Sequence, residues 1–187
     1  MSPSPVPSRG GDWLLLTKQR KNGMKRERAD QFSATGADQP AHQTAALCWR
    51  LHRGRVQVLL ITSRDTGRWI LPKGWPMTGK SAAEAAAQEA WEEAGVHGTP
   101  AAEPLGFYGY DKLRPAGDAL PCLVSVYPLR VTGLADRFPE RKQRRRKWFD
   151  AAKAARKVAE PELRQMLDHL AAPQDSLVLR APVADGA

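Results

Sequence analysis

The sequence predicts a mixed α+β sandwich, because strand-like and helix-like segments follow one another in the order strand, strand, helix, strands, helix. Three observations support this class. Short apolar runs are bounded by turn residues, an alanine-rich segment carries a helix start signal, and the last patterned segment has helical spacing. With 187 residues, 42% of them apolar, the chain is long enough for one domain with a buried core and tails.

Five apolar runs rich in β-branched and aromatic residues are predicted as strands. They cover residues 44–51, 56–63, 69–71, 105–110 and 120–131, and one more short strand ends the basic segment 137–149. The link between the first two runs contains a glycine, which predicts a hairpin turn.

Ser81 is predicted to start a helix, because its hydroxyl can cap the helix and Glu84 stands at capping-box spacing. Alanines with high helix propensity follow, and Gly95 is the natural stop. A second helical pattern covers residues 150–170, with a break at Pro161.

The chain divides by composition into three parts. Residues 1–40 are predicted to be a disordered basic arm, because Pro, Ser and Gly dominate the start and Lys and Arg dominate 18–28. Residues 41–172 are the predicted folded domain, and 173–187 a frayed tail. No apolar run approaches the roughly 20 residues that span a bilayer, so no membrane partner is expected. Cys48 and Cys122 lie in apolar runs, which favours buried free thiols in a cytoplasmic protein.

Three glutamates stand close together near the end of the first predicted helix. Glu89, Glu92 and Glu93 fall within an arc of about 100°. No Lys or Arg lies between residues 81 and 96 to form i,i+4 pairs with them. Two interpretations remain open at this point: an acidic face in water, or a set of oxygen ligands for a hard divalent cation. Gly74 precedes the helix and allows the backbone to approach the acids closely.

These residues resemble the Nudix box, which is matched by Gly74, Glu89, Ala90, Glu92, Glu93, Gly95 and Val96. Two positions differ. Lys80 stands where the box has its first Glu, and Gln88 stands where it has Arg; in the family those two residues interact. Glu84, one turn before Gln88, is a candidate to replace the missing acid. The wider pattern in 63–75 and 147–149 is similar to the diphosphoinositol polyphosphate phosphohydrolase branch and its bacterial relatives.

The resemblance implies the Nudix fold, an α/β/α sandwich with a mixed central sheet. It implies a Mg²⁺-dependent pyrophosphohydrolase, with Mn²⁺ as the alternative ion, that cleaves a phosphoanhydride in a highly phosphorylated substrate. Glu89, Glu93 and the Lys73 backbone carbonyl would hold the metal. Glu92 is the first candidate for proton acceptor, and Glu140 a second candidate base. The implied substrate-binding residues are Ser63, Arg64, Arg68, Lys73, Gly74, Arg144 and Arg145.

The net charge of +9 favours a phosphate-rich small molecule as the partner, such as a diphosphoinositol polyphosphate or a dinucleoside polyphosphate. Two alternatives stay open. One is an RNA 5′-end pyrophosphohydrolase, in which the basic arm grips the RNA. The other is a catalytically weak Nudix module that binds a nucleotide or RNA. No obligatory protein partner is expected.

Overall fold

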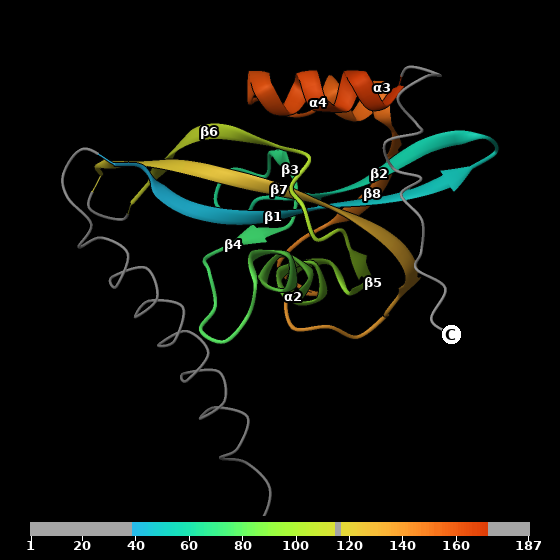
Figure 1. Cartoon of the computed structure of the whole chain (residues 1–187), viewed down its shortest axis with the longest axis horizontal. Coiled ribbons are helices and arrows are strands. Elements are labelled where there is room, and N and C mark those ends of the chain that lie inside the picture. Colours follow the sequence, from blue (N-terminus) through green and yellow to red (C-terminus); the bar gives the residue numbers. More distant parts are fainter. Residues whose placement is uncertain (1–38, 115–116, 172–187) are drawn as a thin grey trace, which may run out of the picture. The chain divides into compact units, whose positions relative to one another are not determined.

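The computed structural model describes residues 39–114 and 117–171, which build one eight-stranded sheet with helices on both faces (Figure 1). The predicted arm up to residue 38 and the predicted tail 173–187 lie outside the described residues. The strands are β1 (Ala41–His52), β2 (Arg55–Thr62), β3 (Trp69–Ile70), β4 (Lys73–Gly74), β5 (Val96–Pro100), β6 (Gly106–Leu113), β7 (Ala119–Leu134) and β8 (Arg146–Asp150). The helices are α2 (Ala82–Ala94), α3 (Ala151–Ala155) and α4 (Pro161–Ala171). The predicted α/β/α sandwich with a mixed sheet is confirmed.

The sheet is mixed because one central pair of strands runs parallel. Its main path is β3-β2-β1-β7-β5, with β1 and β7 parallel and the other pairs antiparallel. The long strand β7 pairs with β6 along its first part and with β5 along its last part. The short strand β4 pairs with β1 at Thr44 and Ala45, so the residues before α2 are attached to the middle of the sheet.

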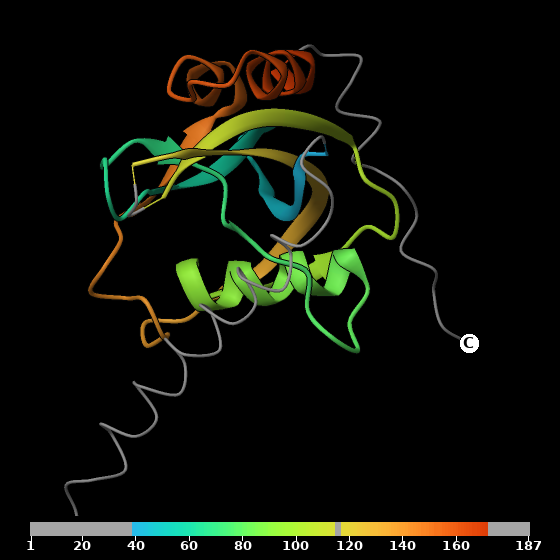
Figure 2. The same ribbon diagram turned by 90° about the vertical axis from the view of Figure 1, so that its left-hand side faces the viewer.

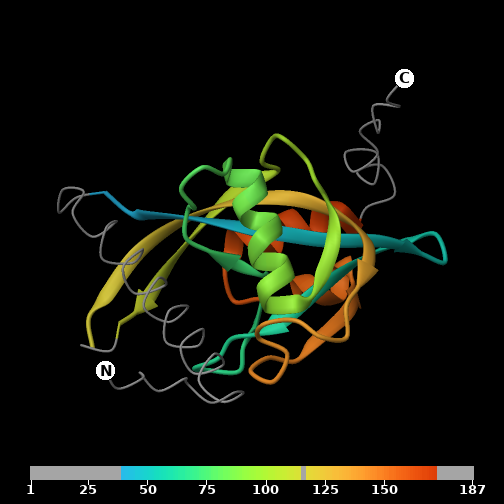
Figure 3. The same cartoon turned by 90° about the horizontal axis from the view of Figure 1, so that it is seen from below.

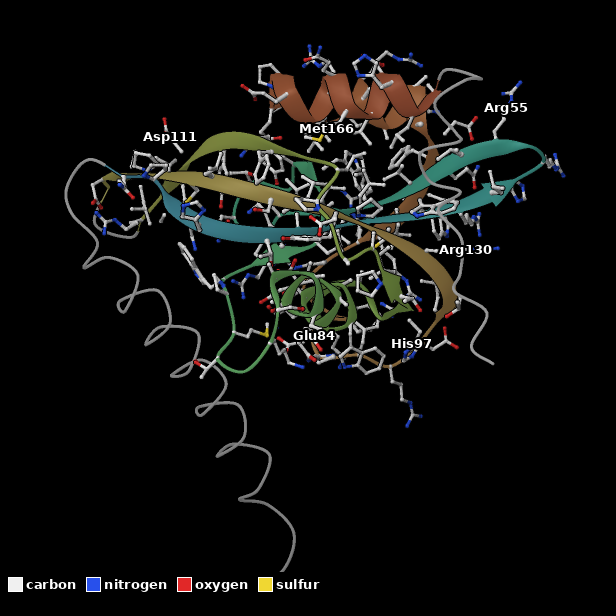
Figure 4. The ribbon with its side chains drawn as sticks, viewed as in Figure 1. Arg55, Glu84, His97, Asp111, Arg130 and Met166 are labelled. Carbon is white, nitrogen blue, oxygen red and sulfur yellow. The ribbon has the colours of Figure 1, made fainter. Side chains whose placement is uncertain are left out.

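Alternation of side chains along the central strands creates two cores. On one face, Leu47 and Val58 pack with Leu163 and Leu167 of α4. On the other face, Cys48 and the alanines of α2 pack together. Figure 2 shows the resulting layers, with α3 and α4 on one side of the sheet and α2 on the other. In Figure 4 Met166 lies beneath α4 and Glu84 lies on the opposite side of the sheet, on α2.

Helix α2 is fixed at both ends, as the sequence predicts. Ser81 Oγ accepts from the Glu84 N–H, and the Glu84 carboxylate accepts from the Ser81 N–H, which completes a capping box. Gly95 ends the helix in the left-handed conformation, with φ of 63°. Arg146 Nη1 donates to the Ala94 carbonyl at 2.6 Å and places a cation at the negative end of the helix. The helix therefore lies in a fixed direction across the sheet (Figure 3).

Some elements differ from the prediction. Strands β4 and β5 were not expected, and the strands β1, β6 and β7 extend beyond their apolar runs. Pro161 begins α4 instead of only interrupting a helix, a position where its missing N–H costs nothing. Both cysteines are free and buried, as predicted. Among the described residues, no helix is long and apolar enough to cross a membrane.

Candidate active site

Two of the three clustered glutamates are buried. Glu89 and Glu93 are each 3% exposed, whereas Glu92 is half-buried. The interpretation of the acids as a solvated helix face is therefore wrong for Glu89 and Glu93. Both carboxylates lie against the segment that contains β4, which precedes α2 and pairs with β1.

Gly74 is required because Glu89 occupies the space where a side chain would begin. A Cβ added at residue 74 would lie 2.1 Å from Glu89 Oε1, which is far inside van der Waals contact. On the same strand, the Lys73 N–H donates to Glu93 Oε2 at 3.0 Å. Backbone residues 73–74 thus contact both buried carboxylates.

An ion-pair chain connects the helix acids to the segment between β7 and β8 and to the loop after β2. Arg144 donates to Glu93 Oε1, and its Nε donates to Glu140 Oε2 at 2.8 Å. Glu140 Oε1 lies 3.7 Å from Arg64 Nη1. The Arg144 side chain is only 6% exposed. We call these four residues, Arg64, Glu140, Arg144 and Glu93, the charge chain; it brings four of the predicted site residues together.

Lys73 projects its side chain into a buried polar network. Its Nζ donates to Tyr110 Oη at 2.9 Å, and Tyr110 Oη donates to Gln43 Oε1 at 2.6 Å. The ammonium also lies 4.3 Å from the Tyr110 ring centroid, at cation–π distance. Burial lowers the pKa of Lys73 to about 8, and the nearby Glu93 carboxylate only partly offsets this effect.

This lowered pKa gives a testable dependence of stability on pH. The folded chain releases the Lys73 proton above pH 8, whereas the unfolded chain keeps it up to about 10.5, the usual value. Below pH 8 the buried ammonium therefore lowers the free energy of unfolding by its full amount. This penalty disappears as pH rises and the folded chain releases the proton. Over this window wild type should gain about 3 kcal/mol of unfolding free energy relative to Lys73→Met.

The measurement is urea unfolding of both proteins between pH 7 and 10, with EDTA present. Burial raises the pKa of Cys48, Cys122, Tyr108 and Tyr110, which lowers stability at high pH in both proteins. Because this effect occurs in both proteins, subtracting one free energy of unfolding from the other removes most of it. If the difference in free energy of unfolding between wild type and Lys73→Met stays constant across the pH range, Lys73 keeps an ordinary pKa.

The other predicted substrate contacts lie on the loop between β2 and β3 and on the segment before β8. Ser63 Oγ lies 2.6 Å from Thr66 Oγ1 and accepts from the Arg68 N–H at 3.2 Å, so the loop is closed on itself. Arg68 Nη1 lies 4.0 Å from the buried Glu160. Arg145 is exposed, with its guanidinium 6.0 Å from the Trp69 ring centroid. Arg144 differs from this group, because it lies inside the charge chain and not at the surface.

The structure shows the surroundings of Lys80 and Gln88, the two residues that differ from the Nudix box. Gln88 Nε2 donates to Glu92 Oε1 at 3.1 Å, one turn further along the helix. The suggestion that Glu84 replaces the missing acid is wrong, because its carboxylate is used in the capping box with Ser81. Lys80 precedes the helix and is exposed.

The donor set fits a hard divalent cation. Two buried carboxylates and the backbone of residues 73–74 offer oxygen, and the lack of a side chain at Gly74 lets the Glu89 carboxylate lie against this backbone. Within residues 39–114 and 117–171, no three Asp, Glu, His or Cys side chains already converge as a complete metal site. A metal bound here would therefore require ligands in addition to the glutamates, such as backbone carbonyls, water or substrate phosphate.

Three residues next to predicted site residues, Tyr110, Gln43 and Glu160, were not expected there from the sequence. Tyr110 and Gln43 are 67 positions apart and meet only because β1 and β6 both pair with β7. The one available signal was period-two alternation, which places Tyr108 and Tyr110 on one face of β6. Glu160 directly precedes Pro161 at the start of α4, and nothing in its neighbourhood in the sequence pointed to Arg68.

The fold places two buried carboxylates of α2 beside arginines of the segment before β8 and of the loop after β2. Residues 41–170 match the NUDIX domain, and the chain belongs to this family.

Comparisons with known proteins agree with that assignment. The chain is 33% identical over 103 residues to Nudix hydrolase 12, mitochondrial, of Arabidopsis thaliana, covering 54% of this chain and 51% of the relative. It is 29% identical over 138 residues to Nudix hydrolase 13, mitochondrial, of the same plant, covering 67% and 68%. The chain thus spans about half to two thirds of the length of these relatives. The crystal structure of a C. elegans Ap4A hydrolase has a similar fold, with a TM-score of 0.53 and 17% identity, over 75% of this chain and 99% of that one.

Proposed function

We propose that the chain is a Mg²⁺-dependent Nudix hydrolase that cleaves a phosphoanhydride in a highly phosphorylated small molecule. The substrate class is a diphosphoinositol polyphosphate or a dinucleoside polyphosphate. The observation that carries the proposal is the burial of Glu89 and Glu93 together against residues 73–74. Membership of the NUDIX domain family and relatives named as Nudix hydrolases support it.

Burial is informative because taking a carboxylate out of water is costly even when it is paired. A fold that needed only a stable helix would be better served by apolar residues at positions 89 and 93. Glu89 and Glu93, with the Lys73 carbonyl, would hold Mg²⁺ or Mn²⁺. When bound, the ion would neutralise phosphate charge and favour ionisation of the attacking water.

The protein's own residues divide the remaining tasks. Glu92 is half-buried and oriented by the Gln88 amide, which suits it to accept a proton from water at the edge of the site. Glu140 is the second candidate for this role, since the charge chain holds it near Glu93 through Arg144. Lys73 supplies a cation beside the acids, fixed by Tyr110.

Surface arginines favour a substrate with several phosphates. Arg64, Arg68 and Arg145 lie on the loop after β2 and on the segment before β8, which hydrogen-bond to each other through Thr62 and Arg145. Their guanidinium groups can bind phosphate oxygens in a bidentate manner. The C. elegans protein of similar fold is named an Ap4A hydrolase, which supports testing dinucleoside polyphosphates.

Two buried free thiols support a reducing location such as the cytoplasm.

The test is a substrate panel with Mg²⁺, in which the phosphate products are separated by ion chromatography. The panel contains a diphosphoinositol pentakisphosphate, Ap4A, a nucleoside triphosphate and a 5′-triphosphorylated RNA. We expect metal-dependent turnover of one of the first two, abolished by EDTA. Faster turnover of the RNA, with binding that weakens steeply in salt, would support the RNA alternative. Binding without turnover would support the catalytically weak module.

A further inference from the structure

The carboxylates of α2 receive no compensating cation from their own helix. Residues 81–96 contain no Lys or Arg, and the neutral Gln88 directs its amide to Glu92 and not to Glu93. A buried carboxylate such as Glu93 must nevertheless be neutralised or hydrogen-bonded. Its compensation therefore has to come from another part of the fold.

That compensation comes from Arg144, which is 51 positions further along the chain. Its guanidinium donates to Glu93, to Glu140 and, through Nη1, to the Thr62 carbonyl at 3.0 Å. Three different nitrogens are used, so the planar group is fixed in position and in rotation. A lysine at this position would keep the positive charge, but its single ammonium could not donate to the three acceptors in the planar arrangement of the guanidinium.

The Arg144 backbone is also held in place. The Thr62 N–H donates to the Arg145 carbonyl, and the Arg145 N–H donates to Thr62 Oγ1 at 3.0 Å. These bonds attach the segment before β8 to the end of β2. The sheet thus helps to position the guanidinium, and the Glu140 N–H, which donates to the Glu92 carbonyl at 3.0 Å, also attaches the same segment to α2.

Both oxygens of Glu93 are consequently directed by protein donors. Arg144 donates to Oε1, and the Lys73 N–H donates to Oε2. One donor on each oxygen holds the plane of the Glu93 carboxylate in one orientation.

We propose that Arg144 is a positioning residue, which fixes the carboxylates of Glu93 and Glu140 so that Glu93 meets a divalent cation in one orientation. This inference rests on the proposed function for its catalytic consequence. Arg144 acts through Glu93 and Glu140 and does not itself need to contact the substrate.

The first test is Arg144→Lys, which keeps the positive charge and removes the planar guanidinium group. We expect kcat to fall about 10- to 100-fold while KM changes less than about twofold, since the substrate-binding loop is untouched. Mn²⁺ binding to the substrate-free protein, followed by electron paramagnetic resonance, should weaken about 10-fold. The control is Arg141→Lys, the same change at an exposed residue of the same segment, which should alter neither quantity.

A second variant tests the guanidinium group directly. Arg144→Ala removes a nearly buried side chain, and added methylguanidine at low millimolar concentration should restore part of both kcat and Mn²⁺ affinity. The same additive should have no effect on Arg141→Ala. Restoration of this kind is not expected if Arg144 contributes only to folding stability.

The outcomes separate the inference from the function on which it rests. If Arg144→Lys keeps wild-type kcat, raises KM alone or leaves Mn²⁺ affinity unchanged, the positioning role is overturned. If wild type hydrolyses no substrate, the proposed function fails, yet the Mn²⁺ titration still decides the role of Arg144. If the variants do not fold, side-chain NMR of wild type decides: slowly exchanging, separately resolved Nη protons of Arg144 support the inference, and a freely rotating group overturns it.

Discussion

Replacement of Glu93 with glutamine is expected to lower kcat about 1,000-fold, which corresponds to about 4 kcal/mol of lost transition-state stabilisation. The amide keeps the shape of the side chain but loses the charge that the proposed metal requires. The rate should be measured at saturating substrate with Mg²⁺ varied up to tens of millimolar. A matched control is Glu103→Gln, an exposed acid before β6, which should retain wild-type turnover.

The same variant should also be less stable in the absence of metal. Repulsion among three acids on one helix would predict that removing a charge stabilises the protein. The structure predicts the opposite sign, because Glu93 compensates the buried Arg144. The free energy of unfolding should fall by about 1–3 kcal/mol. An increase in stability together with full activity would contradict both the ion pair and the metal assignment.

A methyl group at residue 74 should have the second large effect. In Gly74→Ala the new Cβ would overlap the Glu89 carboxylate, which is packed at 2.1 Å from that position. Either Glu89 moves or β4 separates from β1, and a displacement of about 1 Å can cost about 100-fold in rate. We expect that loss in kcat and about 1–3 kcal/mol of lost stability from overpacking.

Gly109→Ala is the matched control for this change. Gly109 lies in β6, and its added Cβ would meet nothing closer than the Cys122 carbonyl at 3.9 Å. This variant should keep wild-type activity and stability. Equal losses in both variants would mean that glycine is needed for strand geometry in general and not for the approach of Glu89.

Much of the fold could be predicted from local signals. The helix from residue 82 to 94 has a capping box at Ser81 and a glycine stop at Gly95, and these features depend only on near neighbours in sequence. Strand β5 has no such signal, because it is five residues long, contains Gly98 and ends at Pro100. It is held by its pairing with the end of β7, which no local pattern reveals.

The acids of the site were predicted, but their surroundings were not. Helical spacing placed Glu89 and Glu93 on one arc of α2 and left a solvated face and a ligand cluster both open, whereas their burial follows from how α2 lies on the sheet. Arg144 was expected to bind a phosphate, since it belongs to a run of basic residues. Arg141 and Arg145 of the same run are exposed, whereas the Arg144 side chain is only 6% exposed. Only the register of the segment before β8 against Thr62 directs Arg144 inward.

The most direct test of the account is a crystal structure of the protein soaked with Mn²⁺, analysed by anomalous scattering at the manganese edge. We expect an anomalous peak coordinated by carboxylate oxygens of both Glu89 and Glu93, and its loss in Glu93→Gln crystals soaked in the same way. A peak held by other residues, or no peak at a saturating Mn²⁺ concentration, would contradict the proposal that the buried acids of α2 form a metal centre.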